Sequence, residues 1–262
     1  MKTIILLCGG KCSGKTTGAT AIYAFQMVAK GCIPNANLSE TGQLSIVYDK
    51  EKNEGIIFDI DSNDPEFLDF KNRQTSRFIN HVGFADELKR TASQLFGLDY
   101  SKLTGSNDQK NEFCHIKWVD MNKLLPNNKK KKNAPEFMTN RQFLEVLGTD
   151  ICRVIYGDCH IQSAYKKLMA LAPEIGIVPD CRFTNEFEFF EKLTDVEVIK
   201  IKFARNVHAS EAESENGLVG VDDSRYDLVI HNEELSVTEK NNLIINFLIE
   251  KEVLSSKNIK VV

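Results

Sequence analysis

The sequence predicts an α/β fold in which a mainly parallel β-sheet lies between layers of helices. Three observations support this prediction. Apolar strand-like runs alternate with amphipathic helix-like runs along the chain, as in βαβ units. The first run, residues 3–8, is almost entirely apolar, as expected of a central strand covered on both faces. A chain of 262 residues is long enough for one such domain with insertions.

The first half of the chain begins with this strand and a glycine-rich segment. The elements expected after it are a helix over 15–29, β-rich runs at 42–49 and 55–61, a core strand within 78–85 and a helix over 85–97. Gly31 and Pro34 end the first helix, and Gly97 ends the second. The two β-rich runs are joined by charged residues and indicate a hairpin. A βαβ crossover does not need this hairpin, so we treat it as an insertion.

The second half continues the alternation. The expected elements are helices over 139–147, 149–157, 161–171 and 185–193, strands over 175–180, 196–204 and 226–232, and a final amphipathic helix after Ser236. Thr139 is the predicted N-cap, because Gln142 follows three residues later as in a capping box. The buried side of that helix is predicted to be Phe143, Leu144, Val146 and Leu147. Gly148 is expected to interrupt the helix before the next one.

Residues 98–135 form a long polar stretch with short apolar patches and a lysine run at Lys129–Lys132. So long a polar connection within a compact domain is usually functional or mobile. A lid over an active site satisfies both descriptions, whereas the lysine run alone indicates a solvated loop. We therefore predict one domain over 1–262, with insertions at about 40–62 and 98–138.

The segment CGGKCSGKTT, residues 8–17, fits the spacing G-x-x-x-x-G-K-[ST] between a strand and a helix. Glycines let the backbone N–H groups turn inward, and the helix N-terminus adds its positive dipole end. Lys15 would then reach the β- and γ-phosphates, and Thr16 would offer a hydroxyl to Mg²⁺. The plainer alternative is a glycine-rich turn with an exposed lysine. The complete motif in this position favours a nucleoside triphosphate site.

Asp180 ends a predicted strand, where an open parallel sheet presents its binding groups. Beside such a phosphate loop, the Asp180 carboxylate can hold Mg²⁺, and Arg182 can face the transferring phosphate. The alternative is a turn at Pro179 and Asp180 with a surface arginine. The upstream loop favours the functional interpretation.

Two further clusters combine acidic and basic residues. Asp86 and Glu87 in a first helical turn are ordinary dipole partners, whereas Lys89 and Arg90 at the same sheet edge could meet a substrate phosphate. Arg141 and Arg153 have spacings that also allow simple intrahelical ion pairs. Arginines in a lid could instead neutralise charge on a transferred phosphoryl group. Spacing alone leaves these alternatives open.

Composition narrows the class of protein. The net charge of −4 does not indicate a nucleic-acid partner, because surfaces that follow a phosphate backbone are usually strongly basic. Seven cysteines without paired spacing indicate cytosolic thiols rather than a disulfide framework. The N-terminal apolar run is too short for a signal or membrane segment. We expect a soluble cytoplasmic protein without a membrane partner.

Taken together, these residues resemble the phage-type deoxynucleoside monophosphate kinases, a branch of the P-loop nucleoside monophosphate kinases. The segments that carry the resemblance are, in order, GGKCSGKTT, FADELKR, RQFLEVLGTDICR, VPDCRFTNE, HASE and DLVIHNEEL. They span nearly the whole chain. The ordered set is more specific than the P-loop, which many unrelated proteins share.

The resemblance implies a P-loop kinase three-layer fold with a lid region. It implies transfer of the γ-phosphoryl group of ATP, with Mg²⁺, to a deoxynucleoside 5′-monophosphate (dNMP), in the supply of precursors for DNA replication. If the chain is of phage origin, the compartment would be the host cytoplasm. Relatives suggest a homodimer, although no stretch of the sequence identifies an interface.

Site residues are carried over by position. The resemblance implies nucleotide binding by Gly9, Gly10, Lys11, Cys12, Ser13, Gly14, Lys15, Thr16 and Thr17. It implies Mg²⁺ ligation by Thr16 and Asp180, catalysis by Lys15, Asp180, Arg182 and Arg153, and acceptor binding by Asp86, Lys89, Arg141, Gln142 and Arg153. The tetrapeptide with His208, Ser210 and Glu211 matches a family motif to which we assign no role. Many relatives have Asp where this chain has Thr16, which is the better Mg²⁺ ligand.

Three other interpretations use the same loop. Another small-molecule P-loop kinase would share the ATP half and differ in its acceptor, and a polynucleotide-end kinase would need a basic groove. A nucleotide-switched binding protein would hydrolyse slowly and bind a partner. The sequence does not specify the accepted base, the oligomeric state or the sugar. Candidates for a steric gate against a ribose 2′-hydroxyl are Tyr100, Trp118 and Tyr156, each equally explicable by packing.

Overall fold

The computed structural model describes residues 1–10, 13–47, 55–60, 62, 65–204, 217–218 and 220–255. The chain divides into two compact units. Unit 1 comprises Met1–Gly83 and Tyr165–Val262, and unit 2 comprises Phe84–Ala164. The region predicted as a lid, at about 98–138, lies inside unit 2.

Unit 1 contains a five-stranded sheet in the order β10-β9-β1-β8-β5, and all neighbouring strands are parallel. Its strands are β1 Thr3–Cys8, β5 Ile79–His81, β8 Ile175–Cys181, β9 Glu197–Ala204 and β10 Leu228–His231. The parallel α/β fold predicted from the sequence is therefore confirmed, with residues 3–8 as the central strand. The strand predicted within 78–85 is confirmed as well, but it is short and lies at the sheet edge.

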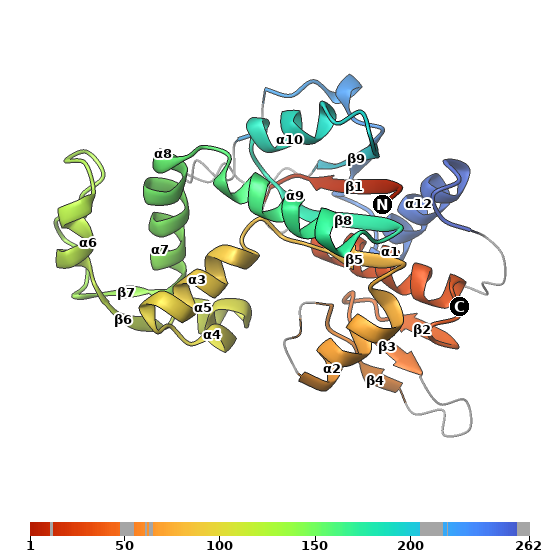
Figure 1. The fold of residues 1–262 in the computed structure, drawn as a ribbon, viewed down its shortest axis with the longest axis horizontal. Helices are drawn as coiled ribbons and strands as arrows, with labels where there is room; N and C mark the ends of the chain where they lie inside the picture. The colour runs from red at the N-terminus through yellow and green to blue at the C-terminus, as the bar shows by residue number, and fades with distance from the viewer. Residues whose placement is uncertain are drawn as a thin grey trace. The chain divides into compact units, whose positions relative to one another are not determined.

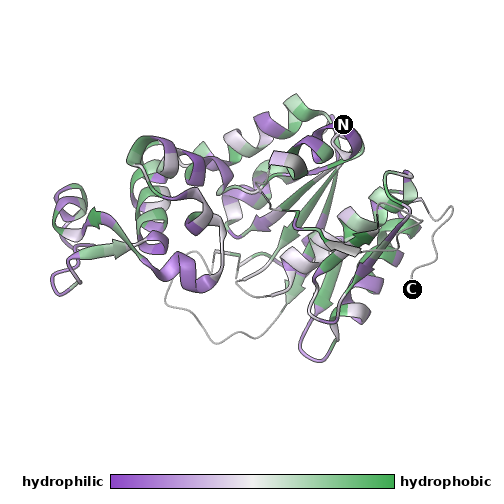
Figure 2. Ribbon diagram, turned by 90° about the horizontal axis from the view of Figure 1, so that it is seen from below, coloured by the Kyte–Doolittle hydropathy of each residue, from purple (hydrophilic) through white to green (hydrophobic). Residues whose placement is uncertain are grey.

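Helices cover both faces of this sheet (Figure 1). They are α1 Lys15–Ala29, α9 Cys159–Leu171, α10 Thr184–Glu191 and α12 Val237–Glu250. Ile5 and Leu7 of β1 are fully buried and pack in one cluster with residues of α1 and α12. Leu168 of α9 packs against Gly176 of β8. Figure 2 shows hydrophobic residues concentrated in the strands, which is the distribution that a two-sided helical cover requires.

The insertion after α1 forms a second sheet in the order β2-β3-β4. Its strands are β2 Asn35–Leu38, β3 Leu44–Val47 and β4 Gly55–Ile57. The antiparallel pairing of β3 with β4 confirms the predicted hairpin, and β2 adds a strand that the sequence analysis missed. Leu44 and Ile46 are buried in the core of unit 1. Residues 48–54, 61 and 63–64 lie outside the described residues. The helix α2, Pro65–Phe70, and a π-helical segment, Lys71–Thr75, lead to β5.

Unit 2 shows that the stretch predicted as a polar connection has regular structure. Its elements are α3 Asp86–Phe96, α4 Tyr100–Thr104, α5 Asn107–Asn111, β6 Phe113–Lys117, α6 Trp118–Leu124, β7 Phe137–Thr139, α7 Asn140–Glu145, a π-helical segment Val146–Cys152 and α8 Arg153–Ile155. Leu103, Trp118 and Met121 are buried in one cluster with Phe143. The few apolar residues of this stretch therefore form a local core, which the average polarity concealed.

The helix break predicted at Gly148 is wrong. The chain continues through this residue as the π-helical segment Val146–Cys152. A Cβ atom at Gly148 would lie 2.7 Å from Leu88 Cδ2, so glycine permits close packing against α3 rather than ending a helix. The predicted cap is confirmed, because Thr139 and Gln142 form a complete capping box. Phe143, Val146 and Leu147 are buried as predicted, and Leu144 is half-buried.

The end of α10 is tied to β9 and the segment before β10 through Glu191. Its carboxylate accepts a hydrogen bond from Arg225 Nη2 at 2.6 Å and one from Lys200 Nζ at 3.2 Å. Arg225 first, and then Lys200, lower the pKa of Glu191 below its usual value. Because the folded-state pKa is the lower one, this stabilisation is present above the unfolded pKa of about 4.3 and is lost as the pH falls through the folded pKa.

We expect Glu191→Gln to lower the melting temperature at pH 7 and to lower it less at pH 3. The side chains are partly solvent-exposed, so the loss at pH 7 should be about 0.5–1 kcal/mol, or roughly 1–4 °C. Scanning calorimetry of both proteins at the two pH values measures the difference. An equal decrease at pH 3 would show that Glu191 acts through packing rather than charge.

Candidate active site

The glycine-rich loop joins β1 to α1 at the carboxyl edge of the large sheet. Gly9 has a φ of 144° and Gly14 a φ of 95°, both in the region that favours glycine. A Cβ at Gly9 would lie 2.7 Å from the carbonyl oxygen of Phe203 in β9. Gly14 is the N-cap of α1, so the loop ends at a helix N-terminus. Lys11 and Cys12 lie outside the described residues.

Lys15 is folded into this loop and is only 6% exposed. Its Nζ donates to the carbonyl oxygen of Gly9 at 2.7 Å, to that of Gly10, and to Ser13 Oγ at 3.3 Å. The ammonium group therefore lies on the inner side of the turn, where it would meet an anion held by the backbone N–H groups.

A cavity of about 270 Å³ opens beside the loop. It is lined by Ser13, Gly14, Lys15, Thr16, Thr17, Pro179, Asp180 and Arg182. The structure thus brings together residues that are more than 160 positions apart in the sequence, because β1 and β8 are neighbouring parallel strands. The cavity combines a lysine, an arginine, hydroxyl groups and one carboxylate. This is a suitable chemical lining for phosphate groups with a divalent cation.

A bulge in β8 positions Asp180. Leu6 pairs with Val178, and the next pair joins Cys8 to Cys181, so β8 has one more residue than β1 across this interval. Such bulges redirect side chains next to active sites. The turn that follows is fixed by Glu186, which is 1% exposed. One Glu186 carboxylate oxygen accepts from the backbone N–H groups of Arg182 at 2.8 Å and Phe183 at 3.1 Å.

Cys181 lies between Asp180 and Arg182 in the sequence, yet its side chain is fully buried. Burial, followed by the adjacent Cys8, raises the pKa of the Cys181 thiol well above its usual value. A thiol that stays protonated in this environment is a poor nucleophile. We therefore assign Cys181 to packing behind the loop and not to the chemistry.

The predicted acceptor residues lie in unit 2. Lys89 Nζ is 4.0 Å from an Asp86 carboxylate oxygen in the first turns of α3. Arg141 donates to Asn111 Oδ1 at 3.0 Å and Asn107 Oδ1 at 2.8 Å, and α5 thereby orients its guanidinium group. Gln142 supplies the capping box of α7, so part of its amide serves helix capping. Arg153 is the first residue of α8.

The remaining candidates of the sequence analysis differ in their surroundings. Trp118 is 5% exposed and belongs to the core of unit 2, whereas Tyr156 is 52% exposed. Tyr100 begins α4 and is half-buried. His208, Ser210 and Glu211 lie outside the described residues.

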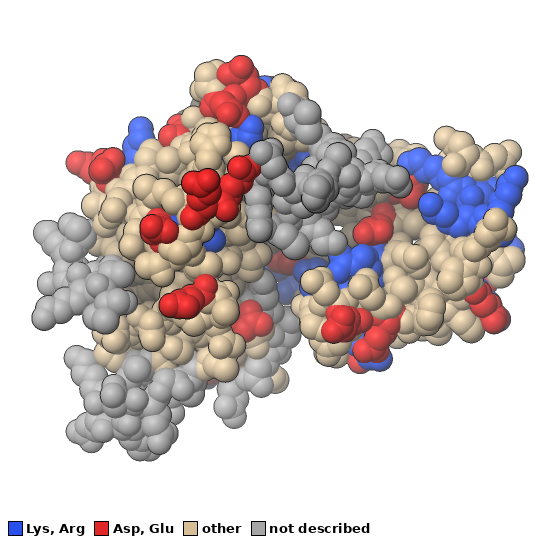
Figure 3. Space-filling model, turned by 180° about the vertical axis from the view of Figure 1, so that it is seen from behind, with Lys and Arg blue, Asp and Glu red and all other residues tan. Residues whose placement is uncertain are grey.

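The lysine run is a defined turn rather than a loose loop. Asn122 of α6 exchanges two hydrogen bonds with the backbone of Lys131, at 3.1 and 3.0 Å. Lys129 pairs with Asp150 at 2.5 Å. Figure 3 shows a dense group of basic side chains over this turn. Its charge makes it an anion-attracting surface, and nothing among the described contacts selects a particular anion.

Within the described ranges, no group of three or more His, Cys, Asp or Glu residues could hold a metal ion by itself. No helix in the same part of the chain is long and apolar enough to cross a membrane.

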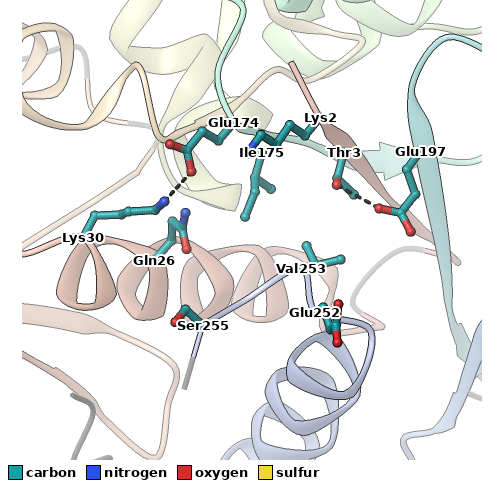
Figure 4. A pocket seen from close by; sticks show the side chains of 10 residues that line it. All are labelled: Lys2, Thr3, Gln26, Lys30, Glu174, Ile175, Glu197, Glu252, Val253 and Ser255. Carbon is teal, nitrogen blue, oxygen red and sulfur yellow. Dashed lines mark hydrogen bonds and ion pairs between the residues drawn. The ribbon is translucent and has the colours of Figure 1, made fainter. Parts of the chain in front are cut away.

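A second cavity, of about 320 Å³, lies at the opposite, amino-terminal edge of the large sheet. Figure 4 shows two contacts among the side chains that line it. Lys30 pairs with Glu174, and Thr3 Oγ1 donates to Glu197 at 3.0 Å. Glycine-rich backbone is absent from its described lining residues. The phosphate-binding features therefore belong to the cavity beside Lys15.

Two residues of the loop region were missed by the sequence analysis. Asn232 Nδ2 donates to the carbonyl oxygen of Ser13 at 2.7 Å, and Lys240 Nζ donates to that of Gly14 at 3.4 Å. Asn232 directly follows β10, and Lys240 lies in α12. No local signal marks Lys240, because a lysine in an amphipathic helix is ordinarily solvent-exposed.

Comparison with known protein families gives a match over most of the chain. A family model described as deoxynucleotide monophosphate kinase matches residues 3–241. No curated protein matched the sequence.

Proposed function

The chain belongs to the deoxynucleotide monophosphate kinase family, and we propose that it transfers the γ-phosphoryl group of ATP, with Mg²⁺, to a deoxynucleoside 5′-monophosphate. The family is one of kinases, so the chain is a phosphotransferase. We propose ATP as the donor and Mg²⁺ as the metal, and the role of each residue is proposed as well. The observation that supports them best is the single cavity shared by Lys15, Asp180 and Arg182.

The lining of this cavity fits a nucleoside triphosphate with its metal. The N-terminus of α1 and the loop N–H groups suit phosphate oxygens. The Thr16 hydroxyl and the Asp180 carboxylate line the same cavity, and both are oxygen ligands of the kind that Mg²⁺ prefers. We propose that these two residues would hold Mg²⁺. When bound, the metal would neutralise charge on the β- and γ-phosphates.

The side chains of the cavity would act by positioning and by charge. The transition state of phosphoryl transfer is loose, and its negative charge spreads over peripheral oxygens. We propose that Lys15 exchanges its present bonds to loop carbonyls for the phosphate oxygens of ATP. Arg182 would stabilise the charge that grows on the transferred group, an interaction that is strongest in a site with little water.

Acceptor binding is assigned to unit 2. We propose that Asp86, Lys89, Arg141, Gln142 and Arg153 serve the dNMP, with Arg153 also contributing to catalysis. This proposal is supported by the resemblance of the segments that contain these residues to those of deoxynucleoside monophosphate kinases. It is also supported by the two asparagines that orient Arg141. The fixed guanidinium group reduces the conformational entropy that phosphate binding would cost.

An acceptor panel tests the proposed reaction. Purified protein with ATP and Mg²⁺ is offered each dNMP, each NMP, nucleosides and no acceptor, and ADP release is recorded. We expect rapid turnover with one or more dNMPs and little without an acceptor. Equal rates with and without acceptor would instead indicate a nucleotide-switched binding protein, and turnover confined to nucleosides or other metabolites would indicate a different kinase.

We expect Arg182→Ala to lower kcat about 100-fold or more while changing the KM for ATP only a few-fold. The guanidinium group is proposed to meet charge that exists mainly in the transition state. Steady-state kinetics with saturating dNMP separate the two parameters. If KM rose strongly at unchanged kcat, Arg182 would be a binding group for ground-state ATP.

A further inference from the structure

Two side chains from the C-terminal part of unit 1 hold the outer surface of the phosphate loop. Asn232 Nδ2 donates to the Ser13 carbonyl oxygen at 2.7 Å, and Lys240 Nζ donates to the Gly14 carbonyl oxygen at 3.4 Å. Lys240 is 2% exposed, which is unusual for lysine. The first N–H of the α1 ladder, that of Gly18, also bonds to Gly14 oxygen, at 3.0 Å. Two consecutive loop carbonyls are thus engaged from the same side.

Consecutive peptide groups connect these contacts to the ligand side of the loop. A peptide C=O and the N–H of the following residue point in opposite directions in the same plane. Holding the Ser13 and Gly14 carbonyls outward therefore fixes the N–H groups of Gly14 and Lys15. A donor on the carbonyl also polarises its peptide group and strengthens the N–H as a donor, because hydrogen bonds in a chain reinforce one another.

The packing at Gly14 is close enough to make this contact specific. A Cβ atom there would lie 2.8 Å from Lys240 Nζ and 3.0 Å from Asn232 Nδ2. Even a methyl group would therefore displace both donors. A charge-assisted hydrogen bond is also stronger than a neutral one, which favours a lysine over another donor at this position.

We propose that Asn232 and Lys240 are positioning residues that preset the N–H groups of Gly14 and Lys15 for the phosphates of ATP. They act through the loop backbone and touch no reacting atom. This inference depends on the proposed function, because it assumes that ATP binds at the loop. It adds two residues from outside the glycine-rich motif to the ATP site.

The test uses two variants and one matched control in the full chain. Lys240→Met removes the ammonium group and keeps an unbranched apolar side chain, and Asn232→Ala removes the amide. Lys251→Met is the control, because Lys251 caps the far end of α12 and is exposed. Lys240→Gln keeps a donor without the charge and should recover part of any loss.

We expect Asn232→Ala to weaken ATP binding about tenfold, the effect of losing one hydrogen bond. Lys240→Met should weaken it about threefold to fivefold, because its contact with the Gly14 carbonyl oxygen is longer, at 3.4 Å. The KM for the dNMP should change less than twofold. The Lys251→Met control should match the wild type. Isothermal titration with ATP·Mg²⁺ and steady-state kinetics give the two affinities. Unchanged ATP affinity in both variants would overturn the proposal.

A second measurement does not depend on ATP. In nucleotide-free protein, the amide resonances of Gly14 and Lys15 should shift in both variants and stay in place in the control. Shifts together with a wild-type protein that does not bind ATP would refute the proposed function and leave the loop-positioning role intact. Unshifted amides would contradict that role, and if Lys240→Met failed to fold, Asn232→Ala alone would decide.

Discussion

Lys15→Ala is expected to lower the rate of phosphoryl transfer by about 10³-fold or more. The Lys15 ammonium group lies inside the loop and lines the proposed phosphate cavity. Its removal leaves the β- and γ-phosphates without this countercharge. Single-turnover kinetics with saturating ATP and acceptor would measure the loss of the chemical step directly.

The fold should survive this substitution, because the hydrogen bonds described for Lys15 go to the loop. Lys30→Ala is a suitable control, since Lys30 follows the other end of α1 and is exposed. The control should retain wild-type turnover. A Lys15→Ala protein with a near wild-type rate and an unchanged melting temperature would remove Lys15 from the mechanism.

Gly9→Ala is expected to destabilise the protein by about 2–4 kcal/mol and to abolish ATP binding. Gly9 combines a φ of 144° with a Cβ position 2.7 Å from a backbone oxygen of β9. Backbone atoms of a central strand cannot move aside as a flexible side chain would. The loop should therefore shift, and the N–H groups should lose their inward direction. Chemical denaturation and ATP titration measure the two effects.

Gly31→Ala is a control that distinguishes the effect of a steric clash at the new Cβ from the effect of a positive φ. Gly31 also has a positive φ, of 69°, but no atom lies within 4 Å of its Cβ position. It should cost only about 1–2 kcal/mol, from the left-handed conformation alone, and ATP binding should be normal. If Gly9→Ala behaved like Gly31→Ala in both assays, close approach of the loop to β9 would not matter for the site.

The elements of the large sheet were predictable because their signals are local. The apolar run at residues 3–8 identified a central strand, and the helix predicted over 15–29 has the observed bounds. The capping box at Thr139 and Gln142 was also visible in the sequence. A capping box and a periodic pattern of apolar residues each depend on residues that are close together in the sequence. Both can therefore be predicted from the sequence alone.

The structure differs from the predictions where residues that are distant in the sequence determine the local conformation. Gly148 resembles a helix breaker, yet Leu88 on another helix packs closely against the position that its Cβ would occupy. The core around Trp118 draws on α3, α4, α6 and α7, and the polar average of its own stretch concealed it. Lys240 is the clearest case for the site, because only the tertiary fold brings α12 to the loop.

The grouping of Asp180 and Arg182 with the glycine-rich loop could be expected from topology. Carboxyl ends of neighbouring parallel strands meet at one edge of a sheet. The β-bulge that places Asp180 could not be expected, because it appears only in the register of β1 with β8. Their chemical roles stay predictions until the variants are measured.

The destination of the γ-phosphate of labelled ATP distinguishes transfer to a dNMP from hydrolysis. The protein is incubated with Mg²⁺, γ-labelled ATP and each dNMP, and the products are separated. We expect the label to appear in the deoxynucleoside diphosphate at the rate at which ADP forms, and we expect Lys15→Ala to abolish this transfer. Label found only in inorganic phosphate, with every acceptor unmodified, would contradict it.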